Sequence, residues 1–295
     1  MKTLILIALG GAIAQLVDGS LGMGFGATST TMLIALAAMN PAVASATVHV
    51  AELGTTLASG ASHWKFKNVD WAVTRKLALP GAVGAFIGAT LLANLSLAFA
   101  KPVTATILTL IGVSLVVRFS RGRRKIKPEG QVKNSTLTTL GFFGGFFDAA
   151  GGGGWGPVTS STLMTIGKAE PRRIVGTVNT AEFLVTLAAS AGFLLAMREQ
   201  ILENITAIGA LLIGGVLAAP VAAWLVSIVN PTLLGGFVGT TLVLTNLGSL
   251  LALLPYHETY APLVYALVTL AGIGLSLRGM FLTKKIHPQT RLSHS

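Results

Sequence analysis

The chain has 295 residues, and only 11% of them are charged, against about 25% in an ordinary soluble domain. Hydrophobic residues make up 52%, and apolar stretches repeatedly reach about 20 residues, the length that a bilayer-spanning helix needs. We therefore predict an integral membrane protein. The absence of cysteine excludes disulfides, thiolate metal sites and cysteine nucleophiles. The net charge of +11 does not by itself indicate nucleic-acid binding, because membrane proteins concentrate Lys and Arg in cytoplasmic loops.

The first predicted element, residues 3–39, is apolar but is interrupted by Asp18 and several glycines. The part before the interruption has about 15 residues and would extend roughly 22 Å, less than a hydrocarbon core of about 30 Å. The part after it is shorter still. Two such pieces form a re-entrant hairpin, whose irregular backbone is tolerated only where protein or a cavity surrounds it. The same reasoning predicts a second hairpin at residues 136–167.

Each hairpin is followed by three predicted transmembrane helices. They lie near residues 44–63, 77–99 and 102–118 in the first half, and near 174–197, 203–229 and 231–254 in the second. A last helix covers about residues 260–280. Pro102, Pro231 and Pro262 are expected at helix starts, where a missing N–H has no cost.

The two halves are related by an internal repeat with an offset of 130 residues. Ten of the 35 residues at 18–52 are identical to those at 148–182, with no gap. The identical positions include Asp18, Pro41 and Glu52 in the first half and Asp148, Pro171 and Glu182 in the second. Shared Leu and Ala do not explain matched Asp, Pro and Glu. The N-terminal run resembles a signal peptide, but its counterpart before Asp148 leads us to expect that it belongs to the mature fold.

An odd number of crossings in each half makes the second half enter the membrane from the opposite face. The predicted fold is an all-α integral membrane protein with two inverted repeats. Each repeat is a re-entrant helical hairpin plus three transmembrane helices, and one extra transmembrane helix follows. The expected divisions are a first repeat at 1–118, a basic cytoplasmic linker at 119–135, a second repeat at 136–256, and a final helix with a basic tail at 257–295. Inverted repeats with broken helices are typical of secondary transporters.

The basic residues favour one orientation of this topology. Four segments that fall on one face (64–76, 118–133, 168–173 and 278–291) hold 18 of the 21 Lys and Arg residues. By the positive-inside rule that face is cytoplasmic. We therefore expect a multi-pass protein of a bacterial inner membrane, with a periplasmic N-terminus and a cytoplasmic C-terminus. The basic run after residue 118 is interpreted as a topogenic loop, and we expect no nucleic-acid partner.

Four of the ten acidic residues fall inside the predicted membrane segments: Asp18, Glu52, Asp148 and Glu182. Carboxylates in a membrane are costly, so they are functional candidates by default. Asp18 and Asp148 begin the two breaks, where they either cap freed N–H groups or take part in transport.

The two glutamates are expected near the midplane, about eight residues into their helices. His49 and Asn179 precede them by three residues on the same helix face. We predict that these residues form a polar core, in which Glu52, Glu182 and His49 either carry coupling protons or keep the polarity of the site fixed.

A hydroxyl-rich segment follows each glycine break: Thr28, Ser29, Thr30 and Thr31 in the first half, and Thr159, Ser160, Ser161 and Thr162 in the second. Free N–H groups at a helix start, together with Ser and Thr hydroxyls, form an anion site without a formal charge. Glycines at positions 24, 26, 154 and 156 (Gly24, Gly26, Gly154 and Gly156) let the backbone approach a ligand closely. We predict substrate binding at both segments, with Phe25 and Trp155 as a gate or wall.

These motifs resemble the TauE/SafE sulfite-exporter family, also called the toluene sulfonate uptake permease family. The resemblance rests on the two glycine motifs, the spacing of Pro41 and Pro171, and residues 81–88, and it covers about residues 5–275. Its most specific parts are residues 148–157 and 177–182. It implies transport of small sulfur-containing or carboxylate anions across a bacterial inner membrane. The first half departs from the fuller pattern, because Met23 and Ala27 stand where the second half has Gly153 and Pro157.

The predicted function is secondary transport of a small anion of the sulfite or organosulfonate class, held between the two hairpins. The partners expected are the anion and the lipid bilayer, and the oligomeric state is left open. No cofactor is expected, apart from a coupling proton or sodium ion. Two alternatives stay open: a passive anion channel of the same architecture, and an intramembrane hydrolase with Asp18 and Asp148 as a proton-sharing dyad. No serine-nucleophile motif is present, so we do not expect an enzyme.

Overall fold

A computed structural model of the protein describes residues 2–21, 23–122, 132–166, 169, 171–225, 231–255 and 257–286. These described residues form eleven α-helices and one π-helical turn, and no strand occurs among them. The middle of the predicted basic linker and the end of the predicted basic tail lie outside the described residues.

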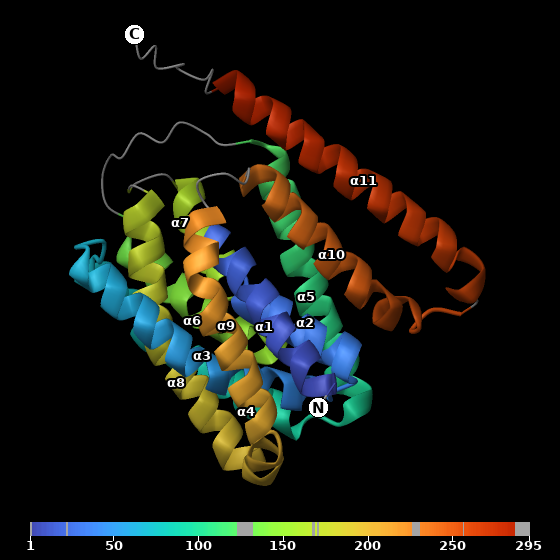
Figure 1. Cartoon of the computed structure of the whole chain (residues 1–295), viewed down its shortest axis with the longest axis horizontal. Helices are drawn as coiled ribbons and strands as arrows, with labels where there is room; N and C mark the ends of the chain where they lie inside the picture. Colours follow the sequence, from blue (N-terminus) through green and yellow to red (C-terminus); the bar gives the residue numbers. More distant parts are fainter. Residues whose placement is uncertain are drawn as a thin grey trace.

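The first half contains five helices. They are α1 (Lys2–Leu21), α2 (Phe25–Ala37), α3 (Pro41–Lys65), α4 (Trp71–Asn94) and α5 (Leu97–Ser120). The second half contains α6 (Asn134–Gly151), the π-helical turn η1 (Gly156–Ser160), α7 (Ser161–Ile166), α8 (Pro171–Glu203), α9 (Ile205–Leu225) and α10 (Pro231–Leu251), and α11 (His257–Ile286) follows them. Figure 1 shows α11 along the outside of the molecule beside α10.

Five helices among the described residues are long and apolar enough to cross a bilayer: α4, α5, α8, α10 and α11. The all-α membrane class predicted from the sequence is therefore confirmed. Helix α3 has 25 residues but carries many polar side chains, and it packs among other helices rather than outside them. Leucines along α11 stay exposed, as in a helix that faces lipid; Leu270 is 67% exposed.

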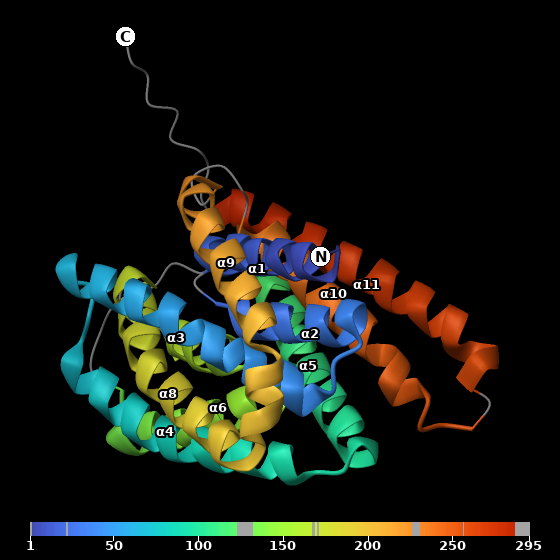
Figure 2. The ribbon, with the colours of Figure 1, turned by 60° about the horizontal axis from the view of Figure 1, so that its bottom comes forward.

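The helices form two groups, and the chain passes between these groups several times. Figure 2 shows α3, α4, α6 and α8 on one side, and α1, α2, α5, α10 and α11 on the other. Extensive contacts join α4 to α6 and α1 to α9. At the offset of 130 residues these two pairs correspond, because α1 matches α6 and α4 matches residues 201–224. The hairpin of each half thus packs against a long helix of the other half.

Glycines permit this close packing at equivalent positions in the two pairs. A Cβ on Gly84 of α4 would lie 2.0 Å from the carbonyl oxygen of Phe142, and one on Gly214 of α9 would lie 1.9 Å from that of Ala8. Any side chain there would force the helices apart. The sequence repeat is therefore also a repeat of helix packing, with small residues at the crossing points, as is common in membranes.

Several helix boundaries differ from those expected. Helix α1 continues to Leu21, so its 20 residues extend about 30 Å rather than roughly 22 Å. Only the second arms are too short to cross a bilayer: α2 has 13 residues, and η1 with α7 spans residues 156–166. Helix α4 begins at Trp71, six residues before the expected start, because Asp70 caps it by accepting from the N–H groups of Ala72 and Val73.

The expectation that proline marks each helix start is only partly correct. Helix α10 begins at Pro231, but Pro102 and Pro262 lie inside α5 and α11. Helix α5 begins five residues earlier than expected, at Leu97, and its first turn is bonded to the carbonyl of Ser96. Helix α8 continues past the expected end of its span to Glu203, through a kink at Met197, whose φ and ψ are −147° and 43°.

Candidate functional site

The two helix breaks touch each other inside the protein. A Cβ on Gly26, in the first turn of α2, would lie 2.7 Å from the Cα of Gly153, in the break after α6. A Cβ on Gly153 would in turn lie 1.9 Å from the backbone nitrogen of Ala27. Gly24, Gly152 and Gly153 have φ values of 110°, 75° and 137°, a conformation that favours glycine. Glycine is therefore required here both for the turns and for the contact between the two halves.

Asp148 holds the second break in place. Its Oδ1 accepts from the N–H groups of Gly154 at 2.6 Å and Trp155 at 2.9 Å. In the first half, Asp18 bonds the backbone N–H of Phe25, which is the residue equivalent to Trp155. Both aspartates thus occupy the capping position at equivalent points of the repeat.

The other oxygen of Asp148 faces His49 from the first half. His49 Nε2 lies 3.2 Å from Asp148 Oδ2, and both side chains are buried. His49 Nδ1 lies 2.8 Å from the carbonyl oxygen of Ser45, and a carbonyl only accepts, so Nδ1 carries a hydrogen. A hydrogen bond between Nε2 and Oδ2 needs one further proton, which is carried either by His49 or by Asp148. The pair is therefore neutral overall and holds one proton at the contact between the two halves.

Hydroxyl groups from three helices bond the free carbonyls at the end of α6. Ser45 of α3 donates to Ala149 at 2.8 Å, and Thr104 of α5 donates to Ala150 at 3.5 Å. Thr30 of α2 donates to Gly152. Ser45 and Thr104 were not predicted as site residues from the sequence. The spacing of Ser45 and His49, four residues apart on one helix face, was the available signal for the first; a lone threonine in an apolar helix gave none for the second.

The four predicted intramembrane carboxylates gather around this contact. Glu52 is buried, and a Cβ on Gly26 would lie 3.2 Å from its Oε1. Glu182, which is half-buried, lies close enough to Glu52, Asp18 and Asp148 to interact electrostatically with all three. One aspartate and one glutamate from each half thus meet in one polar core.

The repeat is not symmetric at the position of the histidine. Asn179 is equivalent to His49, but its Nδ2 donates to Ser59 Oγ of α3 at 3.2 Å. His49 instead reaches the aspartate of the other half and packs against Phe193 of α8, with ring centroids 5.8 Å apart. The structure therefore brings His49 and Asp148 together, while Asn179 makes a different contact.

The predicted hydroxyls divide into two sets. Five are engaged within the protein: Thr30 with Gly152, Thr159 with the carbonyl of Trp155, Thr162 with the carbonyl of Val158, Thr31 with Asn246 of α10 and Ser161 with the sulfur of Met23. Three others are buried and have no hydrogen-bond partner: Thr28, Ser29 and Ser160. The second set has donors and acceptors to offer a ligand. Asn246 was not predicted as a site residue, although an asparagine inside an apolar helix is itself a signal.

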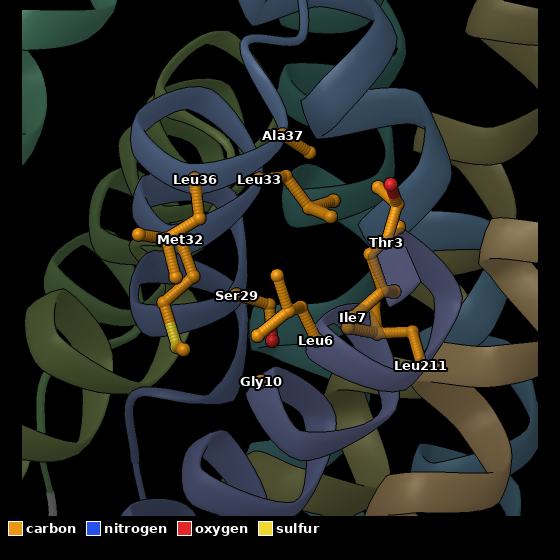
Figure 3. A pocket seen from close by; sticks show the side chains of 10 residues that line it. All are labelled: Thr3, Leu6, Ile7, Gly10, Ser29, Met32, Leu33, Leu36, Ala37 and Leu211. Carbon is orange, nitrogen blue, oxygen red and sulfur yellow. The ribbon is translucent and has the colours of Figure 1, made fainter. Parts of the chain in front are cut away.

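A small pocket lies between α1 and α2, with Leu211 of α9 at its edge (Figure 3). Its volume is about 10 Å³, and it is lined by apolar side chains such as Leu6, Met32 and Leu33, with Ser29 beside them. That volume matches about one water molecule. The pocket is too small for a sulfur oxyanion.

The two aromatic residues at equivalent positions are both enclosed. Trp155 is fully buried, its Nε1 donates to the carbonyl of Val178 at 3.0 Å, and its ring packs against Gly81 of α4 and Gly144 of α6. Phe25 is also buried and lies beside Gly215 of α9. Each ring therefore fills a space left by glycine next to the start of a half-helix.

Long apolar helices around a polar, carboxylate-bearing interior define a multi-pass membrane protein, and broken helices that meet inside it are typical of transporters. Residues 7–249 match the family described as Sulfite exporter TauE/SafE, and the chain belongs to this family. The resemblance inferred from the glycine motifs is therefore confirmed.

Two relatives from Bacillus subtilis (strain 168) support the same class. The chain is 43% identical over 273 residues to "Probable membrane transporter protein YtnM", with 91% of this chain and 89% of the relative covered. It is 28% identical over 196 residues to "Probable membrane transporter protein YjnA", with 62% and 76% covered. No solved structure matches the chain. The protein is a membrane transporter of the TauE/SafE family.

Proposed function

We propose that the protein is a secondary transporter for a small anion of the sulfite or organosulfonate class, or a small carboxylate. The observation that carries this proposal is the contact between the two helix breaks at Gly26 and Gly153, next to three buried hydroxyls without partners. Thr28, Ser29 and Ser160 follow directly on the helix starts. They supply hydrogen bonds without a formal charge, as suits an anion that must be released again.

The backbone at the first break supports anion binding as well. The first intrahelical bond of α2 runs from Thr28 N to the carbonyl of Gly24 at 3.1 Å, so the N–H groups of Gly26 and Ala27 precede it. Such N–H groups and the positive end of the helix dipole favour negative charge. In the second half the residues equivalent to Gly26 and Ala27 are Gly156 and Pro157, and Asp148 already accepts from the N–H groups just before them, those of Gly154 and Trp155. Proline has no N–H, so the Ser160 hydroxyl is the better donor there.

The acidic residues of the core suggest a coupling mechanism. An anion near Glu52 and Glu182 is repelled while both are ionised, so anion binding and neutralisation of these carboxylates must favour each other. A proton provides that neutralisation directly, and a sodium ion is the alternative. The His49–Asp148 pair adds one proton at the contact between the halves. Acidic conditions should therefore favour the loaded state of a proton-coupled carrier.

The repeat supports an inverted topology. We propose two inverted repeats, at residues 1–118 and 136–256, each with a re-entrant hairpin whose tip reaches the membrane midplane. The matched pairs α1–α9 and α4–α6 are the packing that such a pseudo-symmetry requires. The distribution of basic residues supports a periplasmic N-terminus and a cytoplasmic C-terminus in a bacterial inner membrane.

The alternative of a di-aspartyl hydrolase finds no support in the geometry. Asp148 is bonded to two backbone N–H groups and to His49, and Asp18 is bonded to the N–H of Phe25. Each aspartate therefore accepts from the backbone of the break in its own half, whereas a hydrolytic dyad needs the two carboxyl groups to share a proton.

A thermal-shift screen of the detergent-purified protein tests the proposed substrate class. The probes are sulfite, thiosulfate, sulfoacetate, taurine and simple carboxylates, because a ligand that binds only the folded state raises its apparent stability. We expect at least one anion to raise the melting temperature, and the Ser29→Ala and Ser160→Ala variants to lose that increase. Ser190→Ala is the matched control, since Ser190 is also buried and unpartnered but lies on α8, outside the two hydroxyl segments. No increase with any probe would contradict the proposal.

A further inference from the structure

Arg118 is a partly buried cation that takes no part in the proposed site described above. It lies in the last turn of α5, and its side chain points inward rather than into the basic segment that follows. Its Nη1 is buried and has no hydrogen-bond partner. Among the described residues it forms no ion pair with a carboxylate; the pairs found there involve His49 and Arg173 instead.

The contacts that Arg118 does make are weak ones. Its Nη2 lies 2.8 Å from the sulfur of Met164, and a thioether is a poor acceptor for a guanidinium. Its guanidinium carbon lies 5.4 Å from the ring of its neighbour Phe119. A charged group that is largely removed from water normally has a paired or strongly hydrogen-bonded partner. Arg118 therefore has an unused capacity to bind an anion.

Met164 connects this cation to the candidate site. It lies in α7, four residues after Ser160, so the two side chains share one face of the half-helix about one turn apart. Ser160 is one of the three buried hydroxyls without a partner. The guanidinium therefore lies over the same helix face that presents an unpartnered hydroxyl closer to the breaks.

We propose that Arg118 and Ser160 form a second anion-binding position, between the C-terminal end of α5 and the contact of the two breaks. The inference rests on the proposed function and identifies the residue that selects for charge and for oxyanion geometry. A guanidinium offers a planar pair of N–H groups that matches two oxygens of a sulfite, sulfonate or carboxylate group. A substrate without two such oxygens would bind there less well.

The repeat gives no equivalent to Arg118 in the other half. Position 248, at the offset of 130, is Gly248, and the side chain of Tyr265 occupies the space near it. The proposed position is therefore present on one side of the site only. An anion that moves between the two sides of the membrane would meet Arg118 on the side where α5 ends and no cation at the equivalent position in the other half.

The test compares Arg118→Gln, Arg118→Lys and Arg121→Gln in proteoliposomes with labelled sulfite as the probe. Arg121 lies three residues later at the end of the same helix and is exposed, so Arg121→Gln removes the same topogenic charge without touching the site. We expect Arg118→Gln to raise KM for sulfite about tenfold or more, the effect of one lost charge-assisted hydrogen bond. Arg118→Lys should recover only part of it, and Arg121→Gln should match the wild type.

The melting temperature without anion provides an independent measurement. Arg118→Gln should melt at or above the wild-type temperature, because it removes an unpaired buried charge, and sulfite should no longer raise it. If Arg118→Gln matches Arg121→Gln in both KM and the sulfite-induced shift, the inference is wrong while the proposed function stands. If the wild type neither binds nor transports any of the anions, both fail together.

Discussion

Asp148 should contribute far more to stability than an aspartate that caps a helix at the surface. Its Oδ1 accepts from two backbone N–H groups, and its side chain is only 4% exposed. Asp70 accepts from two N–H groups in the same way at the start of α4, but its side chain is 33% exposed. Water replaces the carboxylate when Asp70 is removed, whereas it does not reach the N–H groups of Gly154 and Trp155. The two residues are therefore a matched pair of caps that differ in burial.

We expect Asp148→Ala to lower the free energy of unfolding by about 2 to 6 kcal/mol, since two buried donors each lose about 1 to 3 kcal/mol without an acceptor. Asp70→Ala should cost about 0.5 to 2 kcal/mol, as for other helix caps. Asp148→Asn keeps the accepting oxygen, so it should cost only about 1 kcal/mol. Denaturation of the purified protein, followed by tryptophan fluorescence, measures all three. If Asp148→Ala destabilises the protein no more than Asp70→Ala does, Asp148 does not hold the break as described.

Three further changes test the packing and the core. Gly84→Ala should destabilise the protein by about 1 to 3 kcal/mol through overpacking of α4 on α6, whereas Gly209→Ala, which meets no atom within 4 Å, should be neutral or stabilising in the same unfolding measurement. Trp155→Phe should cost about 1 to 3 kcal/mol, because it removes the buried hydrogen bond from the indole N–H to α8 and part of the ring's packing, and an unchanged melting temperature would contradict that contact. Glu52→Gln together with Glu182→Gln should make anion uptake, which otherwise rises as the pH falls, independent of pH; retained pH dependence would place the coupling group elsewhere.

The repeat is the part of the fold that the sequence could predict well. Matched Asp18 and Asp148 indicated where two helices break, since an aspartate before a run of glycines is a capping signal that needs only neighbouring residues. The break positions at Gly24 and Gly152 follow from the same local pattern. The helix lengths were less predictable. The apolar content of the segment did not predict that α1 continues through Asp18 to Leu21.

The candidate site depended on contacts that no local pattern contains. His49 was predicted to act with Glu52 on its own helix, and the structure pairs it with Asp148, 99 residues away in the other half. The hydroxyl segments were predicted as whole clusters, but the folded protein uses Thr30 and Thr159 to bond the backbone and leaves Ser160 free. Which hydroxyls remain for a ligand is decided by the neighbouring helices, so the sequence alone could not separate them.

The most direct test of the proposed carrier is the initial rate of labelled anion uptake into proteoliposomes, measured against anion concentration and pH with sulfite and sulfoacetate as probes. A carrier with the anion held between two half-helices and coupled to protons predicts a rate that saturates and that rises as the external pH falls. A rate that increases linearly with concentration, with an ohmic single-channel current and no dependence on pH, would contradict the carrier and favour a passive channel.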